Sequence, residues 1–108
     1  PARAAIFKSG DCELQTNLQF EWDEQKAARN KEKHQVDFDE AKTIFDDPLF
    51  ISFIDDEHSL DEERYITIGF SNRGRLLMVA HTEREGQSRI ISARTATKRE
   101  EQYYATAD

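Results

Sequence analysis

The sequence has 108 residues, so we expect one domain with a modest hydrophobic core. Hydrophobic residues make up 37% of the chain and charged residues 34%, which is typical of a globular protein with a strongly charged surface. No stretch approaches the ~18 apolar residues of a membrane span. Because no apolar run follows Arg3 and Lys8, we also expect no signal peptide. The single cysteine, Cys12, excludes an internal disulfide and favours a reducing, cytoplasmic location.

The net charge of −7 argues against nucleic acid, but the charges are unevenly distributed along the chain. Residues 36–63 contain eleven acids and one base, a net charge of −10, whereas residues 64–99 contain eight bases and two acids, a net charge of +6. If this separation persists on the folded surface, one region can face phosphates and another a basic protein partner. If the two segments interleave in the fold, their charges largely cancel. The sequence leaves both arrangements open.

The N-terminal third of the chain predicts one strand and one helix. Residues 1–16 show no clear periodicity, so we interpret them as an extension and place a single domain at residues 17–108. Residues 18–22 alternate apolar and polar side chains, which predicts a strand. Asp23 is placed to cap a helix over residues 23–34. At ~100° per residue, one arc of this helix carries Lys26, Arg29, Asn30, Lys33 and His34.

A second helix and four strands follow. Asp37 and Glu40 form a capping-box pattern, and Pro48 ends that helix. Its core positions are Phe38, Ala41 and Phe45. Strands are predicted at 50–54, 64–70, 75–83 and 88–94, with a hairpin turn at 71–74 and a short last helix at 96–105. Grouped helices followed by grouped strands indicate an α+β domain with an antiparallel sheet.

The chain lacks the common cofactor and metal motifs. It contains no glycine-rich phosphate loop, and its three histidines, His34, His58 and His81, do not have the spacing of zinc ligands. Carboxylates gather between Asp55 and Asp61, but such a run is more typical of a solvated loop than of a cation site. We therefore expect neither a metal ion nor another cofactor.

What remains is a set of cations with a few groups that can transfer protons. Metal-free cleavage of RNA needs a base for the 2′-hydroxyl, an acid for the leaving 5′-oxygen, and cations for the charge on the phosphate. The planar fork of arginine suits phosphate because it binds two oxygens at once. Each cation taken singly could equally be structural, since an arginine in a strand can extend to the sheet edge. Taken together, the eight cations of residues 64–99 favour phosphate binding, which does not separate cleavage from binding.

An ordered set of motifs between Phe20 and Tyr104 resembles the BrnT family of ribonuclease toxins. The match covers almost all of the chain after the extension, and Gln35 stands where the family leads us to expect glycine. The motifs are Phe20-Glu21-Trp22-Asp23-Glu24-x-Lys26-x-x-x-Asn30-x-x-Lys33-His34, Val36-x-Phe38-x-x-Ala41-x-x-x-Phe45-x-Asp47-Pro48, His58-Ser59-x-x-Glu62-x-Arg64-x-x-x-Ile68-Gly69-x-Ser71, Gly74-Arg75-x-Leu77, Thr82-Glu83-Arg84, and Arg89-Ile90-Ile91-Ser92-Ala93-Arg94-x-Ala96-x-x-x-Glu100-x-x-Tyr104.

The resemblance implies a RelE-like fold, in which two N-terminal helices pack on a twisted antiparallel sheet. It implies a toxin of a bacterial type II toxin–antitoxin system that cleaves RNA and slows translation. It also implies a BrnA-like antitoxin, whose ribbon-helix-helix part binds DNA, so that the toxin reaches DNA only through its partner.

Combining the resemblance with the chemistry, we expect Arg64, Arg75 and Arg94 to contact phosphate. Lys33 and His34 are candidates for proton transfer or phosphate binding, and the further acid–base candidates are Glu83, Tyr104, His58 and His81. The candidates for binding RNA away from the scissile bond are Lys26, Arg84, Arg89 and Lys98. Two other hypotheses remain: a nucleic-acid-binding or regulatory module without catalysis, and an interaction protein that works through its acidic segment.

Overall fold

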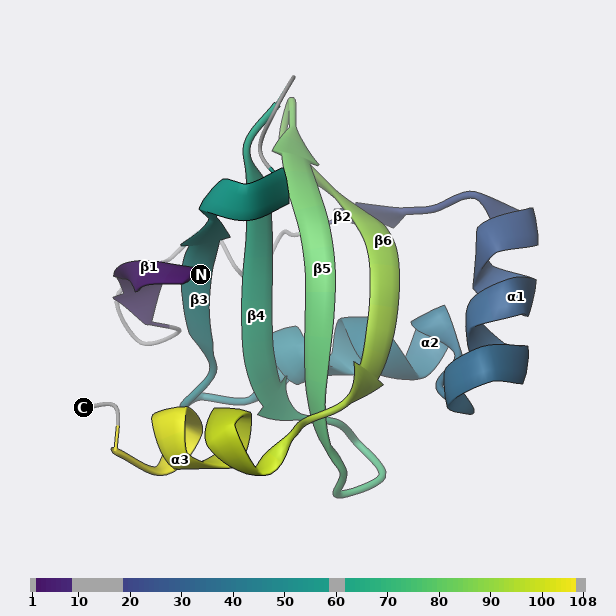
Figure 1. Cartoon of the computed structure of the whole chain (residues 1–108). Coiled ribbons are helices and arrows are strands. Elements are labelled where there is room, and N and C mark those ends of the chain that lie inside the picture. The colour runs from purple at the N-terminus through teal and green to yellow at the C-terminus, as the bar shows by residue number, and fades with distance from the viewer. Residues whose placement is uncertain (1, 9–18, 59–61, 107–108) are drawn as a thin grey trace.

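The computed structural model describes residues 2–8, 19–58 and 62–106 (Figure 1). These residues form an α+β domain, as predicted. In chain order its elements are β1 (Ala2–Lys8), β2 (Gln19–Glu21), α1 (Glu24–His34), α2 (Phe38–Ala41), the 3-10 helix η3 (Lys42–Asp46), β3 (Ile51–Asp55), the 3-10 helix η4 (Asp56–His58), β4 (Arg64–Phe70), β5 (Leu76–Arg84), β6 (Gln87–Thr95) and α3 (Lys98–Thr106).

The described strands form one sheet in the order β1-β3-β4-β5-β6-β2. β3, β4, β5 and β6 are antiparallel neighbours, and the predicted turn joins β4 to β5 through Gly74, whose φ is 76°. At one edge, however, β2 pairs with β6 in parallel, so the prediction of an antiparallel sheet was wrong there and the sheet is mixed. The pairing is non-local, because α1, α2 and the strands β3, β4 and β5 lie between β2 and β6 in the sequence, so no local pattern records its direction.

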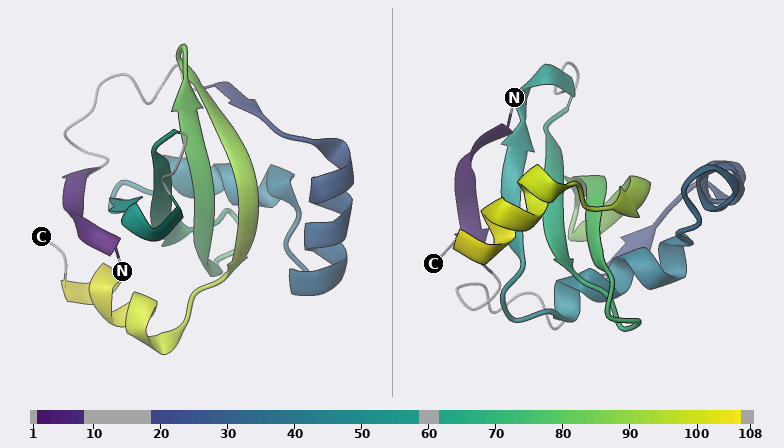
Figure 2. Two further views of the ribbon diagram at one scale, coloured as in Figure 1. Left: turned by 45° about the horizontal axis from the view of Figure 1, so that its top comes forward. Right: turned by 60° about the horizontal axis from the view of Figure 1, so that its bottom comes forward.

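At the other edge, β1 pairs with β3 in antiparallel orientation (Figure 2). The sequence predicted no element there, because residues 2–8 lack the alternation of a half-buried strand. Cys12 lies outside the described residues. The interpretation of residues 1–16 as an extension stays a prediction.

The predicted first helix is confirmed as α1. The Asp23 carboxylate accepts hydrogen bonds from the backbone N–H groups of Gln25 at 2.8 Å and Lys26 at 3.1 Å, as an N-cap should. The helix ends at Gln35, which has a φ of 60°. This left-handed conformation favours glycine, which explains why the family resemblance leads us to expect glycine where this chain has Gln35.

The predicted second helix was wrong in its second half. Asp37 caps α2 by accepting a hydrogen bond from the N–H of Glu40 at 2.7 Å, but the α-helix is only four residues long and continues as η3. The hydroxyl of Thr43 donates to the carbonyl of Glu40 at 2.6 Å and so competes for an acceptor of the α-helix. Both helices follow β2, in the predicted order of strand, helix, helix, so the placement of two helices N-terminal to the sheet, which the resemblance implies, is not confirmed.

The core lies between α2, η3 and one face of the sheet, and α2 passes behind the strands in Figure 1. The predicted positions Phe38, Ala41 and Phe45 are buried there. The backbones of η3 and β4 approach each other closely at Gly69, where an added Cβ would lie 3.1 Å from the carbonyl oxygen of Ile44. On the opposite face a smaller buried cluster consists of Ile51, Ile68 and Met78, with Tyr104 of α3 packed against it. Among the described residues, α3 covers only one end of this second face (Figure 1), and we call it the open face.

Candidate functional site

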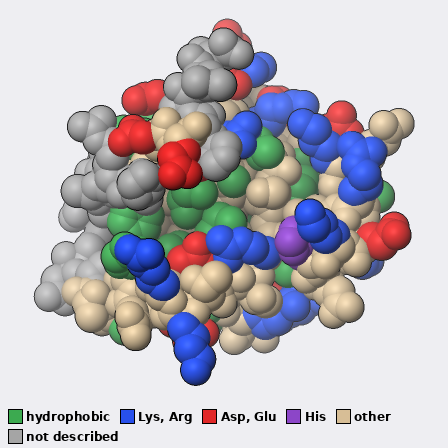
Figure 3. All heavy atoms as spheres, viewed as in Figure 1, with side chains coloured by type: hydrophobic (Ala, Val, Ile, Leu, Met, Phe, Trp, Pro, Cys, Tyr) green, Lys and Arg blue, Asp and Glu red, His purple; other side chains and the backbone are tan. Residues whose placement is uncertain are grey.

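The open face contains a hollow of about 420 Å³. Its floor is apolar, its rim carries charged side chains, and Figure 3 shows blue side chains on several sides of a green depression. Alternation along the strands places every second residue of β4 and β5 on this face. The residues that line the hollow are Phe53, Asp55, Glu57, Arg64, Ile66, Ile68, Met78, Ala80, Ser92, Arg94, Glu100 and Tyr103.

Arg64 and Arg94 are the predicted phosphate contacts that the fold brings to this hollow. Arg64 begins β4 opposite Thr82 of β5, and Arg94 lies near the end of β6 opposite Met78 of β5. Both side chains are partly exposed. The two arginines therefore stand at different ends of one concave surface.

The guanidinium of Arg94 is held by Glu100 of α3. Nη1 and Nη2 donate to the two carboxylate oxygens at 2.8 Å and 2.9 Å. Thr97 also donates to this carboxylate through its N–H at 2.9 Å, while the Thr97 hydroxyl accepts from the N–H of Glu100, which completes a capping box at the start of α3. Partial burial acts to raise the pKa of Glu100, but the hydrogen bonds from Arg94 and Thr97 hold it below its ordinary value. Glu100 is therefore a carboxylate that orients Arg94.

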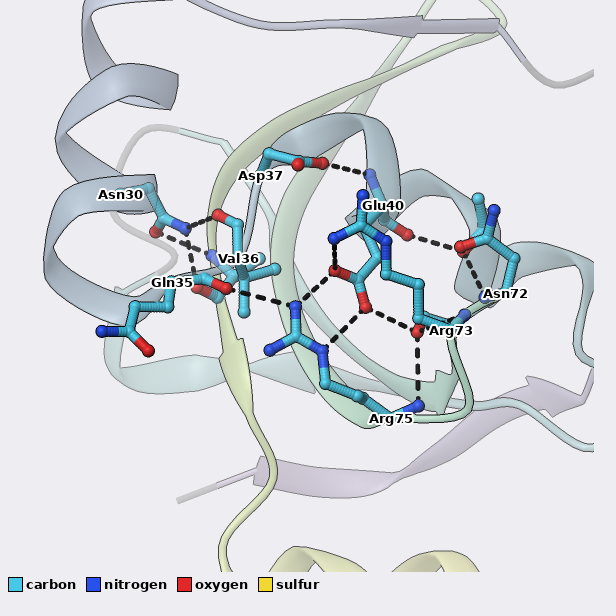
Figure 4. Close-up of polar contacts among 11 residues, drawn as sticks. Asn30, Gln35, Val36, Asp37, Glu40, Asn72, Arg73 and Arg75 are labelled. Carbon is cyan, nitrogen blue, oxygen red and sulfur yellow. Dashed lines mark hydrogen bonds and ion pairs between the residues drawn. The ribbon is translucent and has the colours of Figure 1, made fainter.

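Arg75 lies away from the hollow, in a polar cluster at the β4–β5 turn (Figure 4). Its guanidinium pairs with the carboxylate of Glu40, whose side chain is 1% exposed, and it also donates to the carbonyl of Gln35 at 3.1 Å. Ser71 donates to the same carboxylate at 2.7 Å. The hydrogen bond from Arg75 lowers the pKa of Glu40, although burial acts against it. Arg75 thus joins α2 to the turn, and its guanidinium is already bound to Glu40 and to the carbonyl of Gln35.

Glu83, His81 and Tyr104 also have partners outside the hollow. His81 is 2% exposed, and its ring nitrogens lie 2.6 Å from a carboxylate oxygen of Glu83 and 2.6 Å from the hydroxyl of Thr67. Tyr104 donates to Asp47 at 2.6 Å, and burial together with this contact raises the pKa of the phenol. A phenol with a raised pKa holds its proton more tightly, which makes Tyr104 a weaker acid. His58 lies in η4, and its side chain is outside the description.

Lys33 and His34 occupy the last turn of α1, with Lys33 exposed and His34 half-buried. Asn30 was predicted on the same arc as these cations, and it is 7% exposed and hydrogen-bonded to β6. Its amide donates to the carbonyls of Val36 and Ala93 at 2.9 Å and 2.8 Å and accepts from the N–H of Ala93 at 3.0 Å. His34 follows Asn30 by four residues and so lies on the same side of α1, toward β6.

The remaining RNA-binding candidates are spread along the surface. Arg89 neighbours Thr82 in the sheet and pairs with Glu21 of β2 at 3.2 Å. Arg84 at the end of β5 pairs with Glu62 at 2.8 Å. Lys26 and Lys98 are exposed, on α1 and at the start of α3. The pair of Arg84 with Glu62 joins the basic segment of the sequence to the acidic one, as the pair of Arg75 with Glu40 does, so the two segments meet in the fold at these points.

Sequence reasoning missed the aromatic side of the hollow. Phe53 and Tyr103 line it, and Glu100 belongs to a quoted motif without having been given a role. The signal for Phe53 was present, because alternation along β3 puts it on the face opposite Ser52. Tyr103 could not be separated from its neighbour Tyr104 before the docking of α3 was known.

Two further properties concern only the described residues. Within them, no three His, Cys, Asp or Glu side chains group as metal ligands. No helix in the same residues is long and apolar enough to cross a membrane.

The chain is similar to known toxins in sequence and in fold. The sequence model of a family described as "Ribonuclease toxin, BrnT, of type II toxin-antitoxin system" matches residues 22–100. The crystal structure of the ribonuclease toxin BrnT from Brucella abortus superposes with a TM-score of 0.59 at 23% identity, covering 75% of this chain and 99% of that one. No curated protein sequence gives a significant match. Because the family match extends over most of the chain and includes β3 to β6, the chain belongs to the BrnT family of ribonuclease toxins of type II toxin–antitoxin systems.

Proposed function

We propose that this protein is an endoribonuclease that cleaves RNA on the open face without a metal ion. The observation that carries the proposal is that Arg64 and Arg94 frame one open hollow with an apolar floor. Such a surface can hold the charged backbone of RNA at its rim and a base at its floor. Metal ions commonly stabilise the charge that develops on a phosphate, and arginine can supply the same stabilisation.

We assign the two arginines to different phosphates of the RNA backbone. Their partners on β5, Thr82 and Met78, are four residues apart. At about 3.4 Å per residue along a strand and about 4.8 Å between strands, the Cα atoms of Arg64 and Arg94 lie about 17 Å apart. One phosphate cannot lie close to both backbones. We assign Arg94 to the scissile phosphate, because Glu100 fixes its orientation, and Arg64 to a flanking phosphate.

Glu100 leaves part of the Arg94 guanidinium available. It accepts one N–H from each terminal nitrogen, and the carbonyl of Thr95 accepts from Nη1 as well. The edge formed by Nε and Nη2 keeps donors for phosphate oxygens, since a guanidinium has five N–H groups in a fixed plane. The carboxylate thus positions Arg94 with that edge directed away from α3.

The reaction transfers two protons. The 2′-oxygen attacks the adjacent phosphorus and gives up its proton, the bond from phosphorus to the 5′-oxygen breaks, and the leaving oxygen takes a proton. The products are a 2′,3′-cyclic phosphate and a 5′-hydroxyl. We assign proton transfer to His34, because histidine is the side chain used most often for this purpose. His34 does not line the hollow, but it lies on the side of α1 toward β6, the strand that carries Arg94, and among the described residues no hydrogen bond or ion pair engages its ring elsewhere. Lys33 beside it adds a cation for the phosphate.

The structure favours supporting roles for other candidates. Arg75, Glu83 and Tyr104 do not line the hollow, and each is engaged with a partner elsewhere. We propose that they stabilise the fold that presents the hollow. Lys26, Arg84, Arg89 and Lys98 are proposed to steer RNA toward the open face rather than to act on the scissile bond.

The cellular setting is part of the same proposal. Membership of a toxin–antitoxin family implies an antitoxin partner, which we propose to be BrnA-like, with a ribbon-helix-helix part that binds DNA. We propose that the fold is RelE-like, with the antiparallel pairing of β3, β4, β5 and β6 in its support. We propose that the toxin acts in the cytoplasm and that RNA cleavage there inhibits translation.

The test is incubation of the purified, antitoxin-free protein with total RNA in excess EDTA. We expect cleavage with 2′,3′-cyclic phosphate ends. Arg94→Ala should lower the rate by about 10²–10³, the cost of removing a transition-state contact. Arg64→Ala removes a contact to a flanking phosphate, so it should lower the rate less and mainly weaken RNA binding. The control is Arg73→Ala, since Arg73 is 65% exposed and lies outside the hollow. Activity that requires added Mg²⁺ would contradict the mechanism, and RNA binding without cleavage would favour a non-catalytic module.

A further inference from the structure

The β3 side of the hollow presents two aromatic rings. Phe53 of β3 and Tyr103 of α3 have ring centroids 5.7 Å apart and planes at 57°, so they form an open corner instead of a closed stack. Tyr103 is 43% exposed, and it is one of three large hydrophobic side chains on the described surface with this degree of exposure. An exposed ring that lines a hollow offers a flat apolar surface to a ligand.

This corner lies within reach of Arg94. Glu100, which holds Arg94 at 2.8 Å, precedes Tyr103 by three residues. Residues three apart on a helix are neighbours on one side of it, with about 5–6 Å between their Cβ atoms. The same short helix therefore connects a phosphate-binding arginine with an aromatic ring.

The surroundings of the corner suit a base. The floor beside it is formed by Ile66, Ile68, Met78 and Ala80. The guanidinium of Arg99 lies over the ring of Tyr103, 5.9 Å from its centroid. Aromatic rings and guanidinium planes both stack on nucleobases, whatever the base, because every base has a flat π-face.

We propose that Phe53 and Tyr103 form a subsite for an unpaired nucleobase of RNA, adjacent to the phosphate held by Arg94. This inference rests on the proposed function and extends it to the form of the substrate. A base in a duplex is stacked and paired, so it cannot lie flat on Tyr103. The subsite therefore selects single-stranded RNA, and it tolerates different bases because stacking carries little sequence information.

Binding of an uncleavable RNA probe tests the subsite. The probe is a labelled single-stranded hexanucleotide with 2′-O-methyl groups, which lacks the attacking hydroxyl, and its affinity is measured by fluorescence anisotropy. Tyr103→Ala should weaken binding by about 5- to 150-fold, the effect of losing one stacked base. Tyr103→Phe retains the ring and should bind like the wild type. The matched control is Phe70→Ala, because Phe70 is 45% exposed but does not line the hollow.

A second set of probes, each with one abasic position, identifies the stacked base. One of these probes should bind the wild type more weakly, and Tyr103→Ala should not distinguish it from the complete probe. Equal binding of the complete probe by Tyr103→Ala and the wild type would overturn the subsite, while RNA cleavage by the wild type would still support the proposed function. A Tyr103→Ala variant that loses affinity for the antitoxin but not for the probe would assign the corner to the protein partner and overturn the inference. A wild type that neither binds the probe nor cleaves RNA would overturn both proposals.

Discussion

At the scale of single residues, the arginines differ mainly in the carboxylate partners that their guanidinium groups already have. Arg75 has a carboxylate partner that is almost fully buried, whereas Arg94 has a partner on the rim of an open hollow. The sequence identified both as candidate phosphate contacts. It could not tell them apart, because Glu40 precedes Arg75 by 35 residues and meets it only through the packing of α2 on the turn.

Because the partner of Arg75 is almost fully buried, substitution of Arg75 should lower the stability of the fold. Arg75→Ala should lower the free energy of unfolding by about 3 kcal/mol, at the low end for breaking a buried ion pair, because Arg75 is partly exposed and Glu40 loses its main partner. Urea unfolding followed by circular dichroism measures the change. Arg73→Ala removes a 65% exposed arginine that lies 3.6 Å from the same carboxylate, and it should cost less than about 0.5 kcal/mol. Similar losses of free energy of unfolding for the two variants would show that Arg75 stabilises the fold no more than Arg73 does.

At the scale of elements, local signals predicted α1 and the strands from β2 to β6 closely, but they missed β1, the 3-10 half of the second helix and the parallel pairing at one sheet edge. The strand predicted at 64–70 has those bounds, and the Asp23 cap places α1. Alternation and caps act within a few residues, so one stretch of sequence contains them. The parallel pairing of β2 with β6 joins residues 68 positions apart, such as Glu21 and Arg89, and no local pattern records it.

Asn30 is the residue that fixes α1 to the sheet, and its loss should be costly. Asn30→Ala removes three hydrogen bonds and leaves backbone groups of Val36 and Ala93 buried without them. Each buried group left unsatisfied costs about 1–3 kcal/mol, so we expect a loss of at least about 2 kcal/mol in the free energy of unfolding. Arg29→Ala is the control, because the side chain of Arg29 is exposed on the same helix, next to Asn30 in the sequence. An equally small effect of both variants in urea unfolding would contradict the anchoring role.

At the scale of the whole molecule, a protein with a net charge of −7 is proposed to bind a polyanion. The ion pairs of Glu40 with Arg75 and Glu62 with Arg84 join the acidic segment to the basic one and neutralise part of the separation seen along the sequence. The hollow could be predicted from the sequence only through Arg64 and Arg94. Its floor and aromatic side depend on the register of β3 to β6 and on the docking of α3, which are tertiary properties.

RNA binding should therefore depend on a few close contacts, because at 0.1 M salt, charges separated by more than about 10 Å are largely screened. For single strands, the logarithm of the association constant falls with the logarithm of salt concentration by about 0.7 per phosphate contacted. With two or three phosphates at Arg64, Arg94 and their neighbours, we expect a slope of about −1.4 to −2.1 for the uncleavable hexanucleotide. Arg64→Ala should reduce the magnitude of the slope by about 0.7, whereas Arg73→Ala should leave it unchanged. Anisotropy titrations at four salt concentrations measure both slopes. If Arg64→Ala keeps the wild-type slope, Arg64 does not contact phosphate, and the hollow binds RNA without a phosphate contact at the end where Arg64 lies.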